Sequence, residues 1–213
     1  MSIEENKRPG RLFVLSAPSG GGKSTIKDRV MQKLPELVYS VSFTTRQPRP
    51  GEEDGRDYNF ITEDRFKGMI ESGDFLEWAE VFGRYYGTGK AWVEERLKGG
   101  FDVLADLDVL GAASIKALRP QSTLIFLAPP TALELKRRLA TRQTETSEET
   151  AVRLGRARAE IERREIYDFL VINDDLDKAV DEMVEIITFG RGRAMAASEN
   201  FWSGFFNGCE GLI

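Results

Sequence analysis

The order of apolar and polar residues predicts an alternation of strands and helices over most of the chain. Residues 12–15 form a continuous apolar run that ends in Ser, Ala, Pro, Ser and Gly, which is typical of a buried strand. Apolar residues then recur at helical spacing from Ser24 to Leu34, and Pro35 follows as a stop signal. A strand, a Gly-rich turn and a helix form the first unit of a parallel α/β sheet.

The same alternation continues along the second half of the chain. The pattern predicts buried strands at residues 101–107, 124–128 and 169–172, and helices at about 111–118, 131–140, 147–164 and 176–188. The fold class expected from this order is α/β, with a parallel sheet flanked by helices.

Three segments depart from the alternation. Residues 40–95 carry aromatics, turns and charges without a βαβ pattern, which predicts an inserted subdomain, and residues 141–149 are almost free of apolar side chains, which predicts a mobile surface loop. The segment from Gly190 onward is Gly-rich but aromatic, so it is expected to be neither an ordinary linker nor an ordinary helix. Covering an apolar patch, self-association and a disordered extension all remain open for this tail.

Composition excludes several kinds of chemistry. The chain has 213 residues, 41% hydrophobic and 31% charged, which suits one compact unit with insertions, and its net charge of -5 argues against a general polyanion binder. It contains no histidine and one cysteine, Cys209, which excludes Ser-His-Asp and Cys-His mechanisms and zinc sites built on His or paired Cys. A single cysteine, no secretory signal and no apolar stretch of about 18 residues together lead us to expect a cytoplasmic location without a transmembrane helix.

The segment from Ala17 to Ser24 matches the phosphate-loop pattern G-x-x-x-x-G-K-[ST], with Ala17 in place of the first glycine. Glycines let backbone N–H groups turn toward an anion, and the following helix adds its positive N-terminal end. Lys23 would reach the β- and γ-phosphates, and the Ser24 hydroxyl would bind Mg²⁺. An accidental Gly-rich turn is the alternative, but the position between a strand and a helix favours ATP binding by Ala17, Pro18, Ser19, Gly20, Gly21, Gly22, Lys23, Ser24 and Thr25.

Two arginines in the insertion are candidates for a second phosphate site. Arg46 and Arg49 flank Pro48, which stiffens the loop, and arginine pairs a dianionic phosphate through two parallel hydrogen bonds. The phenol of Tyr58 is a further donor to phosphate. Taken alone, a solvated basic loop is an equally good interpretation.

The segment Ser42–Phe60 matches S-x-T-T-R-x-P-R-x-G-E-x-x-G-x-D-Y-x-F at every fixed position and resembles the guanylate kinases. Segments 75–80, 85–88, 106–108, 144–146 and 171–176 are also similar to that family, so the resemblance spans residues 10–188. It implies the fold of a P-loop nucleoside monophosphate kinase at 10–189. Within it the expected parts are a core at 10–40 and 96–189, a GMP-binding insert at 41–95 and a short lid at about 141–149. Residues 190–213 are then a C-terminal extension of unknown role.

The resemblance also implies roles for individual residues. It implies guanine readers at Ser42, Glu77, Thr88 and Asp108, a GMP phosphate clamp of Arg46, Arg49, Tyr58 and Tyr86, arginines along the transferring phosphate at Arg138, Arg142 and Arg153, and Asn173 beside the adenine. The catalytic set would be Lys23, Arg46, Arg138, Arg142 and Arg153, with Mg²⁺ on Ser24 and Asp106 as a candidate to hold its water shell.

A carboxylate at position 77 suits guanine, because it can accept hydrogen bonds from both N1–H and the exocyclic amino group. Adenine has an acceptor at N1 and would leave the carboxylate unpaired, so adenine would be rejected. The alternative interpretation is that Glu77 is a solvent-exposed acidic residue without a role in binding. The sequence departs from the family at Leu110, where a polar residue is usual, and at Thr141 and Gln143, where the lid usually has glycines.

The expected activity is ATP-dependent phosphorylation of GMP, and also of dGMP, with release of ADP. There are two alternatives: a related P-loop kinase acting on a sugar phosphate, and a catalytically inactive binding module of the same fold. The guanine-reading residues argue against the first, and the phosphate loop and lid arginines argue against the second. The expected partners are ATP and GMP, with no nucleic acid and no membrane, and a homo-oligomer is left open.

Overall fold

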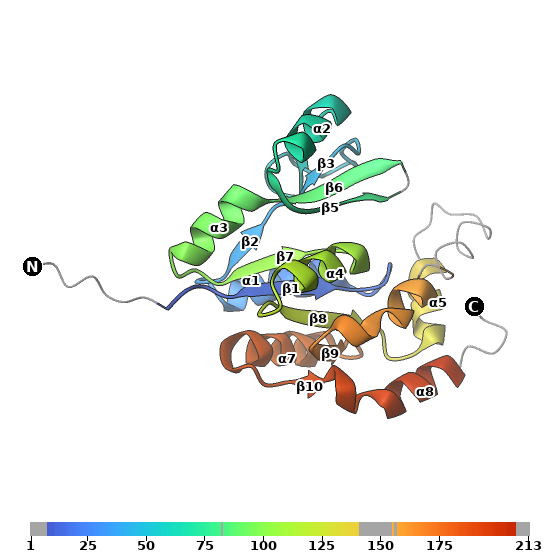
Figure 1. The fold of residues 1–213 in the computed structure, drawn as a ribbon. Coiled ribbons are helices and arrows are strands. Elements are labelled where there is room, and N and C mark those ends of the chain that lie inside the picture. Colours follow the sequence, from blue (N-terminus) through green and yellow to red (C-terminus); the bar gives the residue numbers. More distant parts are fainter. Residues whose placement is uncertain (1–7, 82, 141–154, 156, 208–213) are drawn as a thin grey trace, which may run out of the picture. The chain divides into compact units, whose positions relative to one another are not determined.

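The computed structural model describes residues 8–81, 83–140, 155 and 157–207. Its elements follow one another along the chain as labelled in Figure 1. The strands are β1 Leu12–Ser16, β2 Val38–Ser40, β3 Phe43–Thr44, β4 Asn59–Phe60, β5 Phe75–Val81, β6 Arg84–Gly89, β7 Val103–Asp106, β8 Thr123–Ala128, β9 Phe169–Ile172 and β10 Arg193–Ala194. The helices are α1 Lys23–Lys33, α2 Glu63–Glu71, α3 Lys90–Lys98, α4 Val109–Leu118, α5 Ala132–Ala140, α7 Leu176–Phe189 and α8 Glu199–Asn207, with 3₁₀ turns at Arg164–Ile166 and Met195–Ala197.

The chain divides into two compact units, and each is described by itself. The first unit consists of Met1–Val14 and Pro35–Ser122, and the second of Leu15–Leu34 and Thr123–Ile213. The division falls within β1.

Parallel pairing dominates the larger sheet, whose strand order is β10-β9-β8-β1-β7-β2. In the first unit β2 pairs with β7, with Tyr39 opposite Leu104, and in the second β8 pairs with β9, with Phe126 opposite Leu170. At the edge of the sheet, β10 pairs with β9 antiparallel. The apolar runs that predicted these strands are buried, as expected of parallel strands covered on both faces, so the predicted alternation is confirmed.

In the second unit, helices α1 and α7 pack against each other. Ile26 and Val30 on α1 and Met183 and Ile186 on α7 are almost completely buried. Burying four such side chains contributes on the order of 10 kcal/mol before conformational entropy is subtracted. The apolar face of α7 therefore fastens the helix that follows the Gly-rich turn.

In the first unit, the segment expected as an insertion forms a four-stranded sheet of order β4-β3-β6-β5. Thr62 caps α2 by accepting a hydrogen bond from the Arg65 amide at 3.3 Å. Phe66 on α2 is fully buried and stacks on Phe75 and Tyr85, with ring centroids 4.3 and 5.3 Å apart. This aromatic stack joins α2 to the sheet, and it explains why residues 40–95 are rich in aromatics.

Two element boundaries were wrong. The strand expected at 101–107 begins only at Val103, because Gly100 takes a positive φ of 84° and Phe101 is 40% exposed. Helix α4 begins before Gly111 because Asp108 caps it by accepting the Gly111 amide at 2.8 Å. Of the helix expected at 147–164, residues 157–162 are helical, and most of the rest lies outside the described residues, as does the loop expected at 141–149.

The expectation for the tail was also wrong in part, since residues 199–207 form the ordinary helix α8. Trp202 and Phe205 are each 3% exposed, and the Trp202 ring meets Phe126 of β8 edge-on at 5.9 Å. The Arg164 guanidinium lies over the Trp202 ring at 5.2 Å from the ring centroid. Of the roles left open, this part of the tail covers an apolar patch. Cys209 lies outside the described residues.

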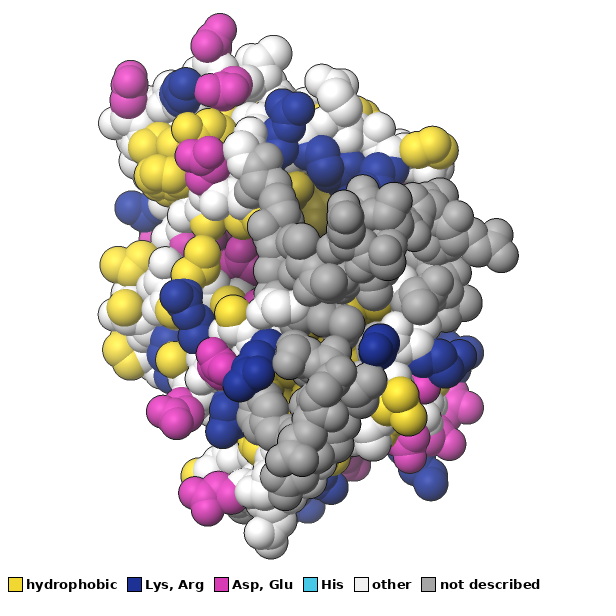
Figure 2. All heavy atoms as spheres, turned by 90° about the vertical axis from the view of Figure 1, so that its right-hand side faces the viewer, with side chains coloured by type: hydrophobic (Ala, Val, Ile, Leu, Met, Phe, Trp, Pro, Cys, Tyr) yellow, Lys and Arg dark blue, Asp and Glu magenta, His cyan; other side chains and the backbone are white. Residues whose placement is uncertain are grey.

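Charges of both signs are interspersed on the face of the molecule drawn in Figure 2, without a continuous basic field over the side chains that are coloured. This agrees with the modest net charge of -5. Among the described residues, no helix has the length and apolar character needed to cross a membrane.

Candidate active site

The Gly-rich turn lies between the end of β1 and the start of α1 at Lys23. Gly20 and Gly22 take positive φ angles of 83° and 90°, which only glycine adopts without strain, so the sequence pattern has its expected backbone. No side chain of the described structure caps α1, and its first turn carries no acidic residue. The backbone of the turn and the positive end of α1 therefore suit an anion.

Two residues of the expected ATP site lie together with this loop in the second unit: Arg138, expected along the transferring phosphate, and Asn173, expected beside the adenine. The Asn173 side-chain amide donates a hydrogen bond to the Gly21 carbonyl oxygen at 2.8 Å. The Arg138 guanidinium donates to the Asn173 carbonyl oxygen at 2.8 Å and to Glu134 Oε1 at 2.7 Å. Hydrogen bonds from Arg137 and Arg138 hold the pKa of Glu134 well below its usual range, so Glu134 is charged and fixes the arginine. Arg142 and Arg153 lie outside the described residues.

The candidates for metal binding are oxygen donors in different units. Ser24 is exposed in the first turn of α1, and Asp106 is the half-buried last residue of β7. Within the described residues no group of three or more His, Cys, Asp or Glu gathers as a cage. A hydroxyl and a carboxylate fit Mg²⁺, which usually takes one or two protein oxygens and completes its shell with phosphates and water.

Glu77 and Thr88 form a buried pair on neighbouring strands of the first unit. The register places Glu77 of β5 opposite Thr88 of β6, and Thr88 Oγ1 donates to Glu77 Oε1 at 2.6 Å. Between Phe75 and Glu77 the register of the two strands shifts, and the three consecutive residues 75–77 are all buried. Glu77 is 7% exposed and Thr88 is fully buried, so the surface interpretation of Glu77 is wrong.

The surroundings of Glu77 make it a carboxyl that titrates near neutral pH. Burial is the largest cause, and together with the charge of Asp108 it outweighs the hydrogen bond from Thr88 and raises the pKa of Glu77 to about 7. Helix α4 lies against β5, and a Cβ at Gly111 would stand 2.6 Å from Glu77 Oε2. Glu77, Thr88 and Asp108 are therefore brought together. Ser42 is 7% exposed and comes directly before β3, while Leu110, the departure beside this group, is exposed.

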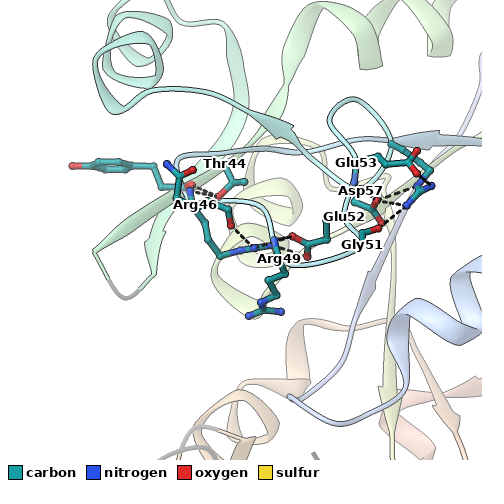
Figure 3. A network of polar contacts seen from close by, with 10 residues as sticks. Thr44, Arg46, Arg49, Gly51, Glu52, Glu53 and Asp57 are labelled. Carbon is teal, nitrogen blue, oxygen red and sulfur yellow. Dashed lines mark hydrogen bonds and ion pairs between the residues drawn. The ribbon is translucent and has the colours of Figure 1, made fainter. Parts of the chain in front are cut away.

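Arg46 is held by a network of polar contacts, drawn in Figure 3. Its two terminal nitrogens donate to the two carboxylate oxygens of Glu52 at 2.9 Å each, and Nη1 also donates to the Gln47 carbonyl at 2.7 Å. The same carboxylate accepts the backbone amide of Arg49 at 2.7 Å, and the Arg46 amide donates to Thr44 Oγ1 at 3.1 Å. The hydrogen bonds from Arg46 keep the pKa of Glu52 below its usual range, so both partners are charged.

Three of the predicted phosphate-clamp residues gather in this region. The Arg46 guanidinium lies over the Tyr58 ring at 5.3 Å, and Tyr58 meets the Tyr86 ring edge-on at 6.0 Å. The exposed Arg49 side chain points away from Glu52 in Figure 3. Arg46, Tyr58 and Tyr86 thus form one cluster, and Arg49 is anchored to it by its backbone.

Sequence reasoning assigned no role to Glu52 or Gly111, although both belong to the contacts just described. Glu52 is a fixed position of the Ser42–Phe60 signature, and its spacing of six residues from Arg46 was the available signal. Gly111 follows the departure at Leu110, but nothing in the sequence shows that Glu77 approaches it.

Comparisons with known proteins agree on one family. A family model described as guanylate kinase matches residues 9–189. A guanylate kinase from Nocardia farcinica is 47% identical over 191 residues, covering 89% of this chain and 99% of the relative. Another from Shewanella violacea is 46% identical over 179 residues, covering 84% and 86%. The crystal structure of a guanylate kinase from Anaplasma phagocytophilum is 33% identical, covers 85% of this chain and 86% of that one, and superposes with a TM-score of 0.72. The chain belongs to the guanylate kinase family.

Proposed function

We infer that the protein transfers the γ-phosphoryl group of ATP to GMP, giving GDP and ADP, as a step of purine nucleotide metabolism. The observation that carries this inference is the buried Glu77–Thr88 pair on the same small sheet as the Arg46 network. The Glu77–Thr88 pair suits the hydrogen-bonding edge of guanine, and the Arg46 network suits a phosphate. The readers assigned here address the base and the phosphate rather than the ribose, so dGMP is an acceptor as well.

Glu77 reads the guanine in its ionised form. Its carboxylate accepts hydrogen bonds from N1–H and the exocyclic amino group, while Thr88 keeps one oxygen fixed at 2.6 Å. Asp108 and Ser42 complete the recognition of the base. Adenine offers an acceptor where the carboxylate needs a donor, and the unpaired buried charge gives strong discrimination.

The acceptor phosphate binds to Arg46, Arg49, Tyr58 and Tyr86. Arginine and phosphate match through two parallel hydrogen bonds, and the phenols add neutral donors. Glu52 already holds the planar guanidinium of Arg46 in one orientation, so less conformational entropy is lost when the phosphate arrives.

The donor triphosphate binds to the phosphate loop, residues 17–25, with Lys23 at the β- and γ-phosphates. Arg138 balances the charge that develops on the transferring group, and Arg142 and Arg153 share that role in the proposal. Ser24 would hold Mg²⁺, with Asp106 as the candidate partner of its water shell, and the ion would supply charge neutralisation at the phosphates.

The chemical step needs no general base. An oxygen of the GMP phosphate, ionised near neutral pH, forms a bond to the γ-phosphorus while the bond from that phosphorus to the β,γ-bridging oxygen breaks. The electron pair leaves with ADP, and catalysis comes from alignment and from cations around the transferring group. The absence of histidine from the chain is therefore compatible with the reaction.

We propose the same organisation as the resemblance implies: a core at 10–40 and 96–189, a GMP-binding insert at 41–95, a lid at about 141–149, and an extension at 190–213. Free ATP and GMP are cytoplasmic metabolites, so the cytoplasm is the proposed location. ATP and GMP are the proposed partners, without nucleic acid or membrane.

The test is ATP-dependent ADP release with GMP, dGMP, AMP, UMP or ribose bisphosphate as acceptor, in the presence of Mg²⁺ at neutral pH. We expect turnover with GMP and dGMP only. Turnover of ribose bisphosphate in place of GMP would support the sugar-phosphate alternative, and no turnover with any acceptor would support an inactive binding module. Lys23→Met should abolish turnover while GMP still binds, and a near-normal rate in that variant would show that the phosphate loop is wrongly placed.

A further inference from the structure

We propose that Asn173 is a positioning residue that sets the orientation of one peptide group in the phosphate loop through its side-chain amide. The resemblance suggests a place for Asn173 beside the adenine, but its side chain contacts the backbone of the loop. The proposal rests on the proposed function, because it concerns how the same loop holds the triphosphate of the donor.

Asn173 is fixed before any ligand arrives. It directly follows β9, and its backbone amide donates to the Ala128 carbonyl at 2.8 Å, which extends the pairing of β8 and β9 by one residue. The residue is 7% exposed. Its side chain therefore starts from a rigid sheet rather than from a loop.

From this position the amide nitrogen of Asn173 reaches across the fold to the loop. Nδ2 donates a hydrogen bond to the Gly21 carbonyl oxygen at 2.8 Å. This bond joins two residues that lie 152 positions apart in the sequence. A Cβ at Gly22 would lie 2.3 Å from the same nitrogen, so the amide occupies the space that a side chain at 22 would need. Two observations, a hydrogen bond and a close approach, thus place the Asn173 amide on the Gly21–Gly22 peptide.

This contact determines which way an N–H group of the loop points. The peptide group is planar and trans, so the carbonyl of Gly21 and the N–H of Gly22 point in opposite directions. When Asn173 binds the carbonyl, the Gly22 N–H is turned away from Asn173. A phosphate loop works only if its N–H groups face the anion and its carbonyl groups are satisfied elsewhere, and Asn173 provides that partner for Gly21.

The same residue holds an arginine of the proposed donor site. Arg138 Nη2 donates to the Asn173 carbonyl oxygen at 2.8 Å, and Arg138 Nε donates to Glu134 Oε1 at 2.7 Å. The side chain of Asn173 donates a hydrogen bond to the loop, and its backbone carbonyl accepts one from Arg138. Substituting the side chain therefore tests the loop contact while the carbonyl that binds Arg138 remains.

The experiment measures binding of inorganic tripolyphosphate with Mg²⁺ by calorimetry, because this probe has no base. Asn173→Ala should weaken tripolyphosphate binding about five- to tenfold, the usual effect of one lost neutral hydrogen bond. Asn173→Asp should weaken it about a hundredfold, because a carboxylate repels both the Gly21 carbonyl and the anion. Both variants should raise KM for ATP or lower kcat while KM for GMP stays unchanged.

The matched control lies at the other end of β9. Asp168 Oδ2 accepts the Leu124 amide at 2.8 Å, a side-chain to backbone hydrogen bond of the same length. Asp168→Ala should lower the midpoint of thermal unfolding and leave tripolyphosphate binding unchanged. Equal losses in Asp168→Ala and Asn173→Ala would show a general loss of stability and would overturn the proposal.

If Asn173 instead contacts the adenine base of ATP, the same experiment gives a different result. If Asn173 acts through the base, the variants weaken ATP binding but bind tripolyphosphate as the unsubstituted protein does, and this outcome also overturns the proposal. Failure of the proposed function is seen separately, since the unsubstituted protein would then bind tripolyphosphate without phosphorylating GMP.

Discussion

Replacing Glu77 by glutamine is predicted to change the pH dependence of both stability and GMP binding. Burial, with the nearby charge of Asp108, raises the pKa of the Glu77 carboxyl to about 7 despite the hydrogen bond from Thr88. Only the ionised carboxylate accepts both guanine donors. Affinity for GMP should therefore fall as the pH drops through about 7.

The same shift predicts how stability changes with pH. The folded pKa of about 7 exceeds the ordinary value of 4.5, so the folded protein retains this proton to a higher pH than the unfolded chain does. The associated stability is fully present below the ordinary pKa and is lost as the pH rises through the folded pKa. The difference corresponds to about 3 kcal/mol lost above that range.

The variant Glu77→Gln has no such proton to lose. Between about pH 5 and pH 8, unfolding in urea should show the variant gaining about 2.5 kcal/mol relative to the unsubstituted protein. A glutamine has no charged group that can accept hydrogen bonds from both N1–H and the exocyclic amino group. At about pH 8 the affinity of the variant for GMP should therefore be lower than that of the unsubstituted protein by at least about a hundredfold.

Calorimetric titration of both proteins with GMP between about pH 5 and pH 8 measures the effect of protonating Glu77 on the affinity for GMP. Protonation of the GMP phosphate affects both proteins equally, so the ratio of their affinities reports the carboxyl alone. The unsubstituted protein should lose about thirtyfold in affinity toward pH 5.5 relative to the variant, as a group of this pKa becomes protonated. An affinity ratio that is independent of pH, or equal affinities at the upper end of the range, would refute this reasoning.

Three other substitutions test separate parts of the structure. Thr88→Val removes the donor to Glu77 and should raise KM for GMP about tenfold near neutral pH, whereas Thr88→Ser should restore it, as measured by steady-state kinetics. Glu52→Gln should raise KM for GMP about tenfold through misplacement of Arg46 and leave KM for ATP unchanged, and an unaltered KM for GMP would contradict that positioning. Trp202→Ala should lower the free energy of unfolding by about 3 kcal/mol or more without changing kcat, and a loss below 1 kcal/mol in urea titration would contradict the packing of α8.

What the sequence could predict is mostly local. The strand at 12–15, the Gly-rich turn and the following helix each depend on neighbouring residues, and all three are present in the structure. The α/β class follows from the repetition of this pattern. The roles of single site residues came from the resemblance to the family, which assigned Arg46, Tyr58 and Tyr86 to one phosphate clamp, and these three residues form one cluster in the structure.

The features that could not be predicted depend on residues far apart in the chain. The contact between Asn173 and Gly21 joins segments 152 residues apart, and the helix with Trp202 is defined by its packing on Phe126 of β8. The register shift between Phe75 and Glu77 depends on the pairing of β5 with β6, which has no sequence signal of its own.

The central claim is that this chain phosphorylates GMP with ATP and recognises the guanine edge through a carboxylate. It is tested most directly by following the label from ATP carrying a labelled γ-phosphorus, with GMP, IMP and AMP as competing acceptors. We expect the label in the β-phosphate of GDP, with weaker transfer to IMP, which lacks the exocyclic amino group, and none to AMP. Label appearing only in inorganic phosphate, or transferred equally to AMP, would contradict the claim.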